Sequence, residues 1–427
     1  PICGALLCTS DGLKVFFCRN FALSLVPDWP LSSRPSVIPA GVTPRIVGTA
    51  GDVRGDYAAV LACAWGSPSQ AFGTMYAPFD GGRKVPRLPG PPYLCVSRIA
   101  DVDCPAGQAT EGARLVAEFD VEPDAWYFQD NPSGVMPYCV LLEALLQPCG
   151  WLGSYMGFAV EGDEDMCFRN LDGDDAELLS VVEPDSGTLR VEVTATRSAR
   201  AGDMSLVFYD VESFVGDMPV MRLKTSFGFF KTAALRDQAG LSADDTRRAW
   251  LTKPSERAVK MVWPRISADN LRMIDKVTGL WPDAGAAGLG RIRGQQTVDP
   301  NAWYFKAHFF QDPVQAGSLG IEALLQLLQC FMIETNLDRG IPNPRFEPAA
   351  LGIAAWWRYR GQVLPTVGEV ITELEITRIE REEGSVLAMA NGNVWADGTR
   401  IYEVGELGMR VVPGKSPAHI DVDIERM

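Results

Sequence analysis

The chain has 427 residues, of which 47% are hydrophobic and 22% are charged, a globular composition that excludes disorder, collagen and coiled coil. Its 54 acidic residues outnumber its 39 lysines and arginines, and the net charge of −15 disfavours a general nucleic-acid-binding surface, which needs a basic field. At about 150 residues per domain, the length predicts two or three structural units.

The amino-terminal part of the chain precedes its repeated part. The opening at Pro1 lacks the basic region of a secretory signal and suits a segment of a larger polypeptide. Residues 12–26 alternate like the strands that end each later repeat. We therefore expect residues 1–30 to be the last strands of another such unit upstream, with an unrelated hairpin as the alternative. Residues 27–44, rich in Pro and Ser, predict a linker, and residues 56–79 predict a short helix.

A long motif occurs twice in the chain. Residues 122–147 and 299–326 both open with acidic-Pro-x-Ala-Trp-Tyr-Phe and close with Glu-Ala-Leu-Leu-Gln. The segments before each copy share a strand–turn–strand pattern, and strand-rich segments end the two units at 216–230 and 398–412. The chain therefore contains a duplicated unit.

Each copy of the motif leads into a long apolar run. Residues 135–160 are long enough to span a bilayer and hold one charge. However, prolines interrupt this run, and residues 318–333 repeat its pattern. In each run an amide follows a carboxylate by four residues, as Glu143–Gln147 and Glu322–Gln326. Two matched runs of this kind predict buried core helices, so we reject a membrane span.

Strands are predicted after both helices. They lie at 189–196, 204–211, 354–359, 369–378 and 385–394. A long helix that is buried on all sides needs a sheet wrapped around it. We therefore expect an α+β fold with one helix and about five to seven antiparallel strands in each unit.

We divide the chain into five parts. These are an N-terminal strand segment and linker (1–85), a first unit (86–240), a linker helix (241–262), a second unit (263–415) and a C-terminal tail (416–427). We expect Ser242, with Asp245, to cap the linker helix.

Cysteine and histidine usage argues against a metal site. The ten cysteines show no CxxC spacing, and several lie inside apolar runs, which predicts reduced core thiols in a cytoplasmic protein. The two histidines, His308 and His419, have no neighbouring cysteine cluster, so we expect no zinc site. His419, in the polar tail, is expected at the surface. No glycine-rich phosphate loop of dinucleotide type occurs, and we expect no cofactor.

Three segments of the second unit carry a family resemblance. Residues 302–326, 356–379 and 397–412 read AWYFKAHFFQDPVQAGSLGIEALLQ, WWRYRGQVLPTVGEVITELEITRI and DGTRIYEVGELGMRVV. They resemble the bacterial β-hydroxydecanoyl-ACP dehydratase/isomerase family, which has a hotdog fold. The doubled arrangement, preceded by residues 62–93, is similar to dehydratase domains of polyunsaturated fatty acid synthases. The resemblance covers roughly residues 56–413 and implies a double hotdog, two tandem units packed as a pseudo-dimer.

The resemblance implies a 3-hydroxyacyl-ACP dehydratase, with enoyl isomerisation as a further activity left open. Its partners would be an acyl carrier protein with a phosphopantetheinyl acyl chain and other synthase domains, without a nucleic acid or a membrane. Arg83, Lys84 and Arg87 are candidates for meeting an acidic carrier, and an ordinary solvated loop is the alternative. Two other functions stay open: a hotdog thioesterase that uses a carboxylate and water, and a non-catalytic acyl-binding scaffold.

Dehydration of a thioester requires a base, an acid, and donors for the oxyanion on the carbonyl. His308 is the predicted base, because its ordinary pKa of about 6.5 lies near working pH. Glu143 and Glu322 are candidate acids, because apolar surroundings raise the pKa of a carboxyl. Gln147 and Gln326, one turn further along, can orient them.

The start of the second apolar helix is the predicted oxyanion site. Gly317 allows close approach of a thioester oxygen to free backbone N–H groups and to the positive end of the helix dipole. In the first unit, the bulkier Tyr138 occupies the matching place.

The two units differ at the position of the histidine. Asn131 in the first unit corresponds to His308 in the second. In homodimeric relatives the histidine of one hotdog faces the carboxylate of its partner. The resemblance therefore implies one competent site, His308 with Glu143, and an inactive pair of Asn131 with Glu322. Spacing alone leaves a pair of His308 with Glu322 open.

Several residues beside His308 have weaker assignments. Asp312 lies in an Asp-Pro turn, which is more often structural than catalytic. Phe309 and Phe310 are candidates for lining the acyl chain. The aromatic residues of the repeated motif, 126–128 and 303–305, are expected in strand cores.

Overall fold

The computed structural model describes residues 2–10, 13–23, 55–80, 83–160, 164–202, 204–235, 238–259, 266–267 and 269–414. The predicted linker at 27–44, the C-terminal tail and His419 lie outside these residues.

The two halves of the chain repeat one order of elements. The first half contains β3 (Arg98–Val102), β4 (Ala113–Asp120), α3 (Trp126–Asp130), α4 (Tyr138–Tyr155), β5 (Met166–Leu178), β6 (Thr188–Ala201), β7 (Met204–Val215) and β8 (Met218–Lys231). The second contains β9 (Lys276–Trp281), β10 (Arg291–Thr297), α6 (Trp303–Ala307), α7 (Gly317–Glu334), β11 (Pro344–Phe346), β12 (Ala354–Tyr359), β13 (Glu369–Glu382), β14 (Ser385–Ala396) and β15 (Thr399–Pro413). The five strands predicted after the helices lie within β6, β7, β12, β13 and β14.

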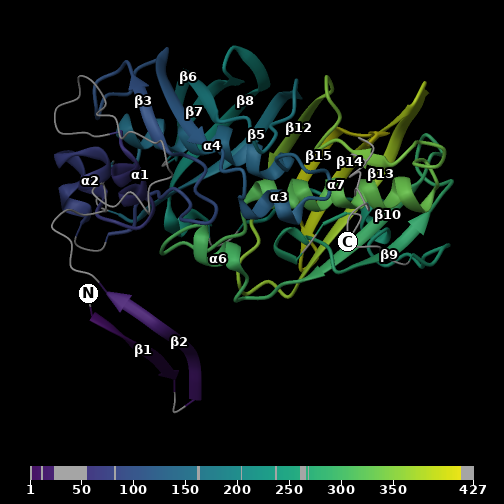
Figure 1. Cartoon of the computed structure of the whole chain (residues 1–427), viewed down its shortest axis with the longest axis horizontal. Coiled ribbons are helices and arrows are strands. Elements are labelled where there is room, and N and C mark those ends of the chain that lie inside the picture. Colours follow the sequence, from purple (N-terminus) through teal and green to yellow (C-terminus); the bar gives the residue numbers. More distant parts are fainter. Residues whose placement is uncertain are drawn as a thin grey trace, which may run out of the picture.

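One antiparallel sheet runs through both halves in the order β3-β4-β6-β7-β8-β5-β12-β15-β14-β13-β10-β9, and β11 pairs with β15 (Figure 1). The halves join where β5 pairs with β12, with Ala176 opposite Ala355. At this join a Cβ on Gly173 would lie 2.1 Å from the ring of Trp357, so the position requires glycine.

The two long helices lie inside the curve of this sheet (Figure 1). Every residue of α4 is buried, as are most residues of α7, and the two helices contact each other across the halves. A helix that is apolar on all sides satisfies its own backbone hydrogen bonds and gains stability from burial of each face. This is the α+β double hotdog that the resemblance implies, so the predicted fold is confirmed.

The amino-terminal part forms small elements of its own. The helical pattern at 56–79 forms α1 (Tyr57–Ala64), α2 (Pro68–Phe72) and a 3₁₀ turn over Thr74–Phe79. The strands β1 (Ile2–Ser10) and β2 (Leu13–Leu23) pair in a separate two-stranded sheet.

The repeated aromatic motif forms helices, so its assignment to strand cores is wrong. Trp126 begins α3 and Trp303 begins α6, and their rings meet edge to face with centroids 5.2 Å apart. These tryptophans occupy equivalent places in the two halves, so the motif forms a contact between the units. Packing against the equivalent aromatic residue overrides the preference of Trp, Tyr and Phe for strands.

The membrane and cysteine predictions can be compared with the described residues. Among them, no helix is long and apolar enough to cross a membrane. The seven cysteines whose side chains are described are buried and form no disulfide with one another, and burial raises the pKa of each thiol: Cys63, Cys95, Cys104, Cys139, Cys149, Cys167 and Cys330. They are core thiols, as predicted.

The linker helix is shorter than predicted and begins later. It is α5 (Asp245–Ala249), and its cap is Asp244, whose side chain accepts a hydrogen bond from the Arg247 backbone N–H at 2.7 Å. The predicted cap, Ser242, instead uses its carbonyl to accept a hydrogen bond from Arg400. The backbone is thus bonded to β15 of the second half at Ser242, before α5 begins.

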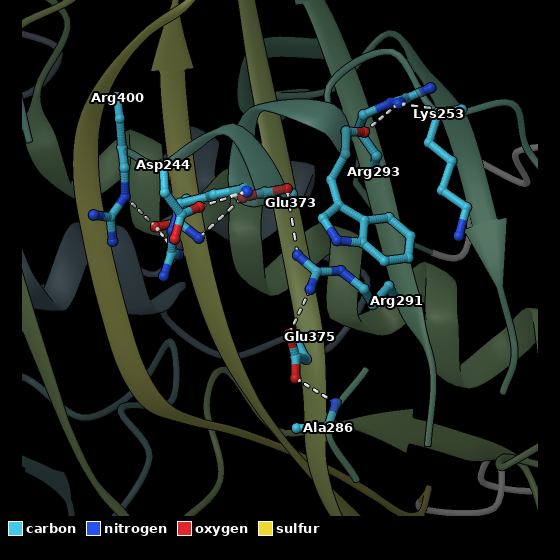
Figure 2. A network of polar contacts seen from close by, with 11 residues as sticks. Asp244, Lys253, Ala286, Arg291, Arg293, Glu373, Glu375 and Arg400 are labelled. Carbon is cyan, nitrogen blue, oxygen red and sulfur yellow. Dashed lines mark hydrogen bonds and ion pairs between the residues drawn. The ribbon is translucent and has the colours of Figure 1, made fainter. Parts of the chain in front are cut away.

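Beyond α5 the linker covers a buried charged layer on that sheet, which Figure 2 shows from close by. Glu373 of β13 accepts a hydrogen bond from Asn393 at 3.1 Å and pairs with Arg291 at 3.6 Å. Arg291 also pairs with Glu375, and the guanidinium of Arg293 donates to the Trp250 carbonyl. The linker is therefore anchored to the second half by side chains that have little access to water.

Glu373 is the most buried carboxylate of this layer, with 3% of its side chain exposed. Replacing it with alanine leaves the Arg291 and Asn393 donors without this partner, so we expect Glu373→Ala to lower the free energy of unfolding by about 3 kcal/mol. The matched control is Glu380→Ala on the same strand, where the exposed pair with Arg378 contributes at most about 1 kcal/mol. Urea unfolding measures both; equal losses would contradict the assigned role of Glu373.

Candidate active site

A cavity of about 530 Å³ lies where the two halves meet. The first half contributes residues from α4, β5, β7 and β8, and the second contributes the loop between α6 and α7, the start of α7, and β12. Both His308 and Glu143 line this cavity, from opposite halves, together with Gln147, Gly317 and Ser318. Glu322 is not among its lining residues, so the geometry favours the pairing across the halves.

Glu143 projects from the middle of α4 and is 5% exposed. Its Oε2 accepts a hydrogen bond from Gln147 at 2.9 Å, one helical turn away, as the i, i+4 spacing predicts. Its Oε1 accepts a hydrogen bond from the Ser318 hydroxyl of the other half at 2.7 Å. Burial raises the pKa of Glu143, and these two donors oppose the shift. Burial therefore favours the protonated form of Glu143, and the two hydrogen-bond donors stabilise the carboxylate that remains when the proton leaves.

His308 ends the short helix α6 and is buried. Its Nδ1 lies 3.0 Å from the Val314 carbonyl, which can only accept, so Nδ1 carries the proton of the neutral ring. The other ring nitrogen is then left with a lone pair. Burial lowers the pKa of His308 to about 3, so the imidazole is neutral at physiological pH and can accept a proton.

The amino end of α7 lies against the same cavity. No side chain caps this 18-residue helix, and its first residue is Gly317. A Cβ at Gly317 would come within 2.6 Å of the Tyr359 ring, so this close approach requires glycine. The first N–H groups of α7, with the positive end of its dipole, are available to a carbonyl oxygen in the cavity.

The equivalent place in the first half is built differently. Asn131 bonds to the Val135 carbonyl at 2.9 Å, as His308 bonds to the Val314 carbonyl, but an amide is no base. Tyr138 fills the place of Gly317 and is buried. Glu322 accepts hydrogen bonds from Gln326 and Cys139, and burial raises its pKa. The polar framework is retained there without a base.

Gln147 and Gln326 also tie each helix to the segment before its sheet. Gln147 donates to the Tyr93 carbonyl at 2.9 Å and accepts from the Cys95 backbone N–H at 2.8 Å. Gln326 makes the same pair of contacts with Leu271 and Met273. Both glutamines are therefore structural, and Gln147 also orients Glu143.

Asp312 forms ion pairs with two basic residues from outside its own loop. Its carboxylate pairs with Arg169 of β5 at 2.8 Å and with Lys84 at 3.4 Å. It thus ties the loop that follows His308 to the first half. Lys84, a candidate for carrier docking, is occupied by this pair.

The aromatic and basic residues that were predicted to contact the acyl chain or the carrier lie in different surroundings. Phe309 lines the cavity, where its ring lies 5.4 Å from that of Phe168. Phe310 does not line it and is 43% exposed beside Arg87, so its assignment to the acyl chain is corrected. The reason is that neighbouring residues of a loop point in different directions. Arg87 is itself buried and donates to the carbonyls of Ala62 and Gly66, so it is no solvated docking residue.

Three site residues were missed at the sequence level. The side chain of Ser318 contacts Glu143, Tyr93 contacts Ser318 at 3.0 Å, and Tyr359 packs against Gly317. The match of Ser318 with Cys139 in the repeat was a usable signal, since both are small donors. Tyr93 corresponds to Leu271, so the repeat offered no signal for its hydroxyl.

The chain is similar to several known proteins. The model of the FabA-like domain matches residues 88–224 and 266–405. A polyunsaturated fatty acid synthase polypeptide from Thraustochytrium sp. is 30% identical over 393 residues, which are 83% of this chain and 26% of that protein. The chain therefore spans about a quarter of the length of this curated relative.

Solved structures with partial similarity include enzymes of two kinds. The dehydratase domain from the CurJ module of curacin polyketide synthase is 12% identical, with a TM-score of 0.40, over 73% of this chain and 97% of that one. A MaoC-like dehydratase is 14% identical, with a TM-score of 0.39, over 72% and 99%. A protein assigned as an oleoyl thioesterase from Lactobacillus plantarum is 11% identical, with a TM-score of 0.40, over 71% and 98%.

The two glutamines should contribute equally to stability. Removing either side chain leaves a buried N–H and a buried carbonyl without their partner, so we expect Gln147→Ala and Gln326→Ala each to lower the free energy of unfolding by about 3 kcal/mol. The control is Gln329→Ala on α7, whose Oε1 has no hydrogen-bond partner among the described residues and which should lose less than about 1 kcal/mol. Urea unfolding that ranks Gln147→Ala with the control would contradict this role.

The buried imidazole should make stability depend on pH. The pKa of His308 is about 3 when folded against an ordinary 6.5, so between these values the unfolded chain binds a proton that the folded chain does not. Stability is therefore present above pH 6.5 and is lost as pH falls through this window. Relative to His308→Asn, the native chain should lose about 2 kcal/mol between pH 7.5 and 5. Parallel pH profiles of unfolding would contradict the neutral, buried histidine.

Proposed function

The chain belongs to the FabA-like domain family, and on this premise we propose that it removes water from a 3-hydroxyacyl thioester to give an enoyl thioester. The observation that carries this proposal is the shared cavity lined by His308 of one half and Glu143 of the other. Burial lowers the pKa of His308 to about 3, so its imidazole is neutral, and burial raises the pKa of Glu143, which shifts its carboxyl toward the acid form. These are the protonation states that an elimination needs at its start.

In the proposed reaction, the free ring nitrogen of His308 takes the proton from the carbon next to the thioester carbonyl. The electrons of that C–H bond form the new double bond, and the bond from the next carbon to the hydroxyl breaks. Glu143 gives its proton to the departing hydroxyl, which leaves as water. The N–H groups at the start of α7 hold the negative charge that develops on the thioester oxygen. Transfer of a proton from imidazolium to carboxylate restores the site.

Phe168 and Phe309, which line the cavity near the histidine, suit contact with the apolar acyl chain. A thioester on an acyl carrier protein is the proposed form of the substrate. The similarity to a longer synthase polypeptide, of which the match covers 26%, supports a role beside other synthase domains. Buried thiols that form no disulfide among the described residues fit a reducing compartment, and we assign the chain to the cytoplasm.

The roles can be tested on a synthetic 3-hydroxyacyl carrier substrate with product analysis. We expect His308→Ala and Glu143→Gln each to lower turnover by about 10²–10⁴-fold, because each removes one proton-transfer step. The matched control is Glu322→Gln, the equivalent residue of the other half, which should stay within about twofold of the native chain.

Three results would contradict the proposal. Loss of turnover in Glu322→Gln with activity retained in Glu143→Gln would show that the acid is Glu322 of the second half. Free acid in place of an enoyl thioester would indicate a thioesterase. No conversion by the native chain would favour an acyl-binding scaffold. The ratio of 2-enoyl to 3-enoyl products shows whether His308 also moves a proton between the two carbons that isomerisation requires.

A further inference from the structure

Ser318 connects the two halves at the acid of the proposed site. It lies in the first turn of α7, is 1% exposed, and donates its hydroxyl proton to Glu143 on α4 at 2.7 Å. The Tyr93 hydroxyl, which is also buried, lies 3.0 Å from the Ser318 oxygen. A buried chain of hydroxyls therefore reaches the carboxyl group from the opposite side to Gln147.

The number of protons on each hydroxyl decides which group donates in the hydrogen bonds that join Tyr93, Ser318 and Glu143. A serine hydroxyl has one proton, and the Glu143 oxygen takes it, so Ser318 accepts from Tyr93. The single proton of Tyr93 is shared between Ser318 at 3.0 Å and the Cys139 carbonyl at 3.3 Å. Once Glu143 has given its proton away, its oxygen is charged and the hydrogen bond from Ser318 becomes stronger. An interaction that strengthens as the proton leaves lowers the barrier of the step in which it leaves.

The first half has a weaker donor at the equivalent position. There Cys139 contacts Glu322 through its thiol and its backbone N–H, which lower the pKa of Glu322 against the effect of burial. A thiol is a poorer hydrogen-bond donor than a hydroxyl. The stronger donor thus faces the carboxyl group that shares a cavity with a histidine.

We propose that Ser318, supported by Tyr93, is a positioning residue that holds Glu143 in line for proton donation and stabilises the carboxylate that results. This inference rests on the proposed function and adds a residue to it. The site would then depend on three contributions across the interface: the base and Ser318 from the second half, and the acid from the first.

Burial has the largest effect on the pKa of Glu143, and the hydrogen bonds from Gln147 and Ser318 oppose it. The titratable groups that face it are Tyr93 and Cys95 before β3, Cys139 on its own helix, Tyr359 on β12, and His308 across the cavity. Burial raises the pKa of these phenols and thiols, so they are neutral near pH 7, as is His308. The charged residues that line the cavity are Arg169, Asp172 and Arg360, and Arg169 is paired with Asp312.

The test compares Ser318→Ala and Ser318→Cys with the native chain by dehydration rate against pH. Glu143 must hold its proton to act, so its loss of a proton sets the alkaline limb. Removing a donor to the carboxylate raises its pKa, so Ser318→Ala should move this limb upward by about one pH unit. It should also lower kcat about tenfold with KM unchanged. Ser318→Cys, which copies Cys139, should fall between the two. The control is Ser154→Ala, which replaces a buried serine near the end of α4 and should change neither the alkaline limb nor kcat.

A second measurement reads the carboxyl group without turnover. Infrared difference titration, with Glu143→Gln subtracted to assign the band, should show the same upward shift in Ser318→Ala. If neither the limb nor the band moves, the inference is wrong even when kcat falls, because a structural role alone would explain that loss. If the native chain converts no 3-hydroxyacyl thioester, the proposed function fails, and the infrared titration still decides whether Ser318 controls Glu143.

Discussion

Burial of two titratable side chains in one cavity is the constraint on which the site depends. An imidazole and a carboxyl group that are removed from water both lose stability in their charged forms, so burial lowers the pKa of the histidine and raises the pKa of the glutamic acid. A base and an acid in these states are what an elimination needs. The same burial would be costly without the hydrogen bonds that each group makes with Val314, Gln147 and Ser318.

The duplicated fold explains how one chain builds such a cavity from two unequal halves. Both halves keep a buried helix with a glutamate, and in both a glutamine donates to that glutamate and ties the helix to the segment before the first strand of its half. The second half supplies a histidine and a glycine where the first has Asn131 and Tyr138. Because each cavity would need residues from both halves, these replacements remove the base from one place and leave the other complete. In our proposal, the retained glutamate of the first half, Glu143, serves the place that keeps its histidine.

The sequence predicted the architecture well because the repeat is long and its helices are apolar on every side. The pair of His308 with Glu143 followed from the position of the repeats together with the family resemblance. Local features were predicted less well. The helices of the Trp-Tyr-Phe motif were not predicted, because the contact of Trp126 with Trp303 joins segments that are distant in the sequence. Phe310 and Arg87 could not be placed, since the orientation of a loop side chain depends on its surroundings. The side chain of Ser318 was missed, because its contact with Glu143 crosses the interface.

The central claim is that the histidine of the second half and the glutamate of the first act on one substrate molecule. The most direct measurement is a crystal structure of the Glu143→Gln chain with an unreacted 3-hydroxyacyl pantetheine thioester bound. Our account predicts one ligand per chain, with its α-carbon beside His308, its hydroxyl beside residue 143, and its thioester oxygen at the start of α7. A ligand seated between His308 and Glu322, or beside Asn131, would contradict it.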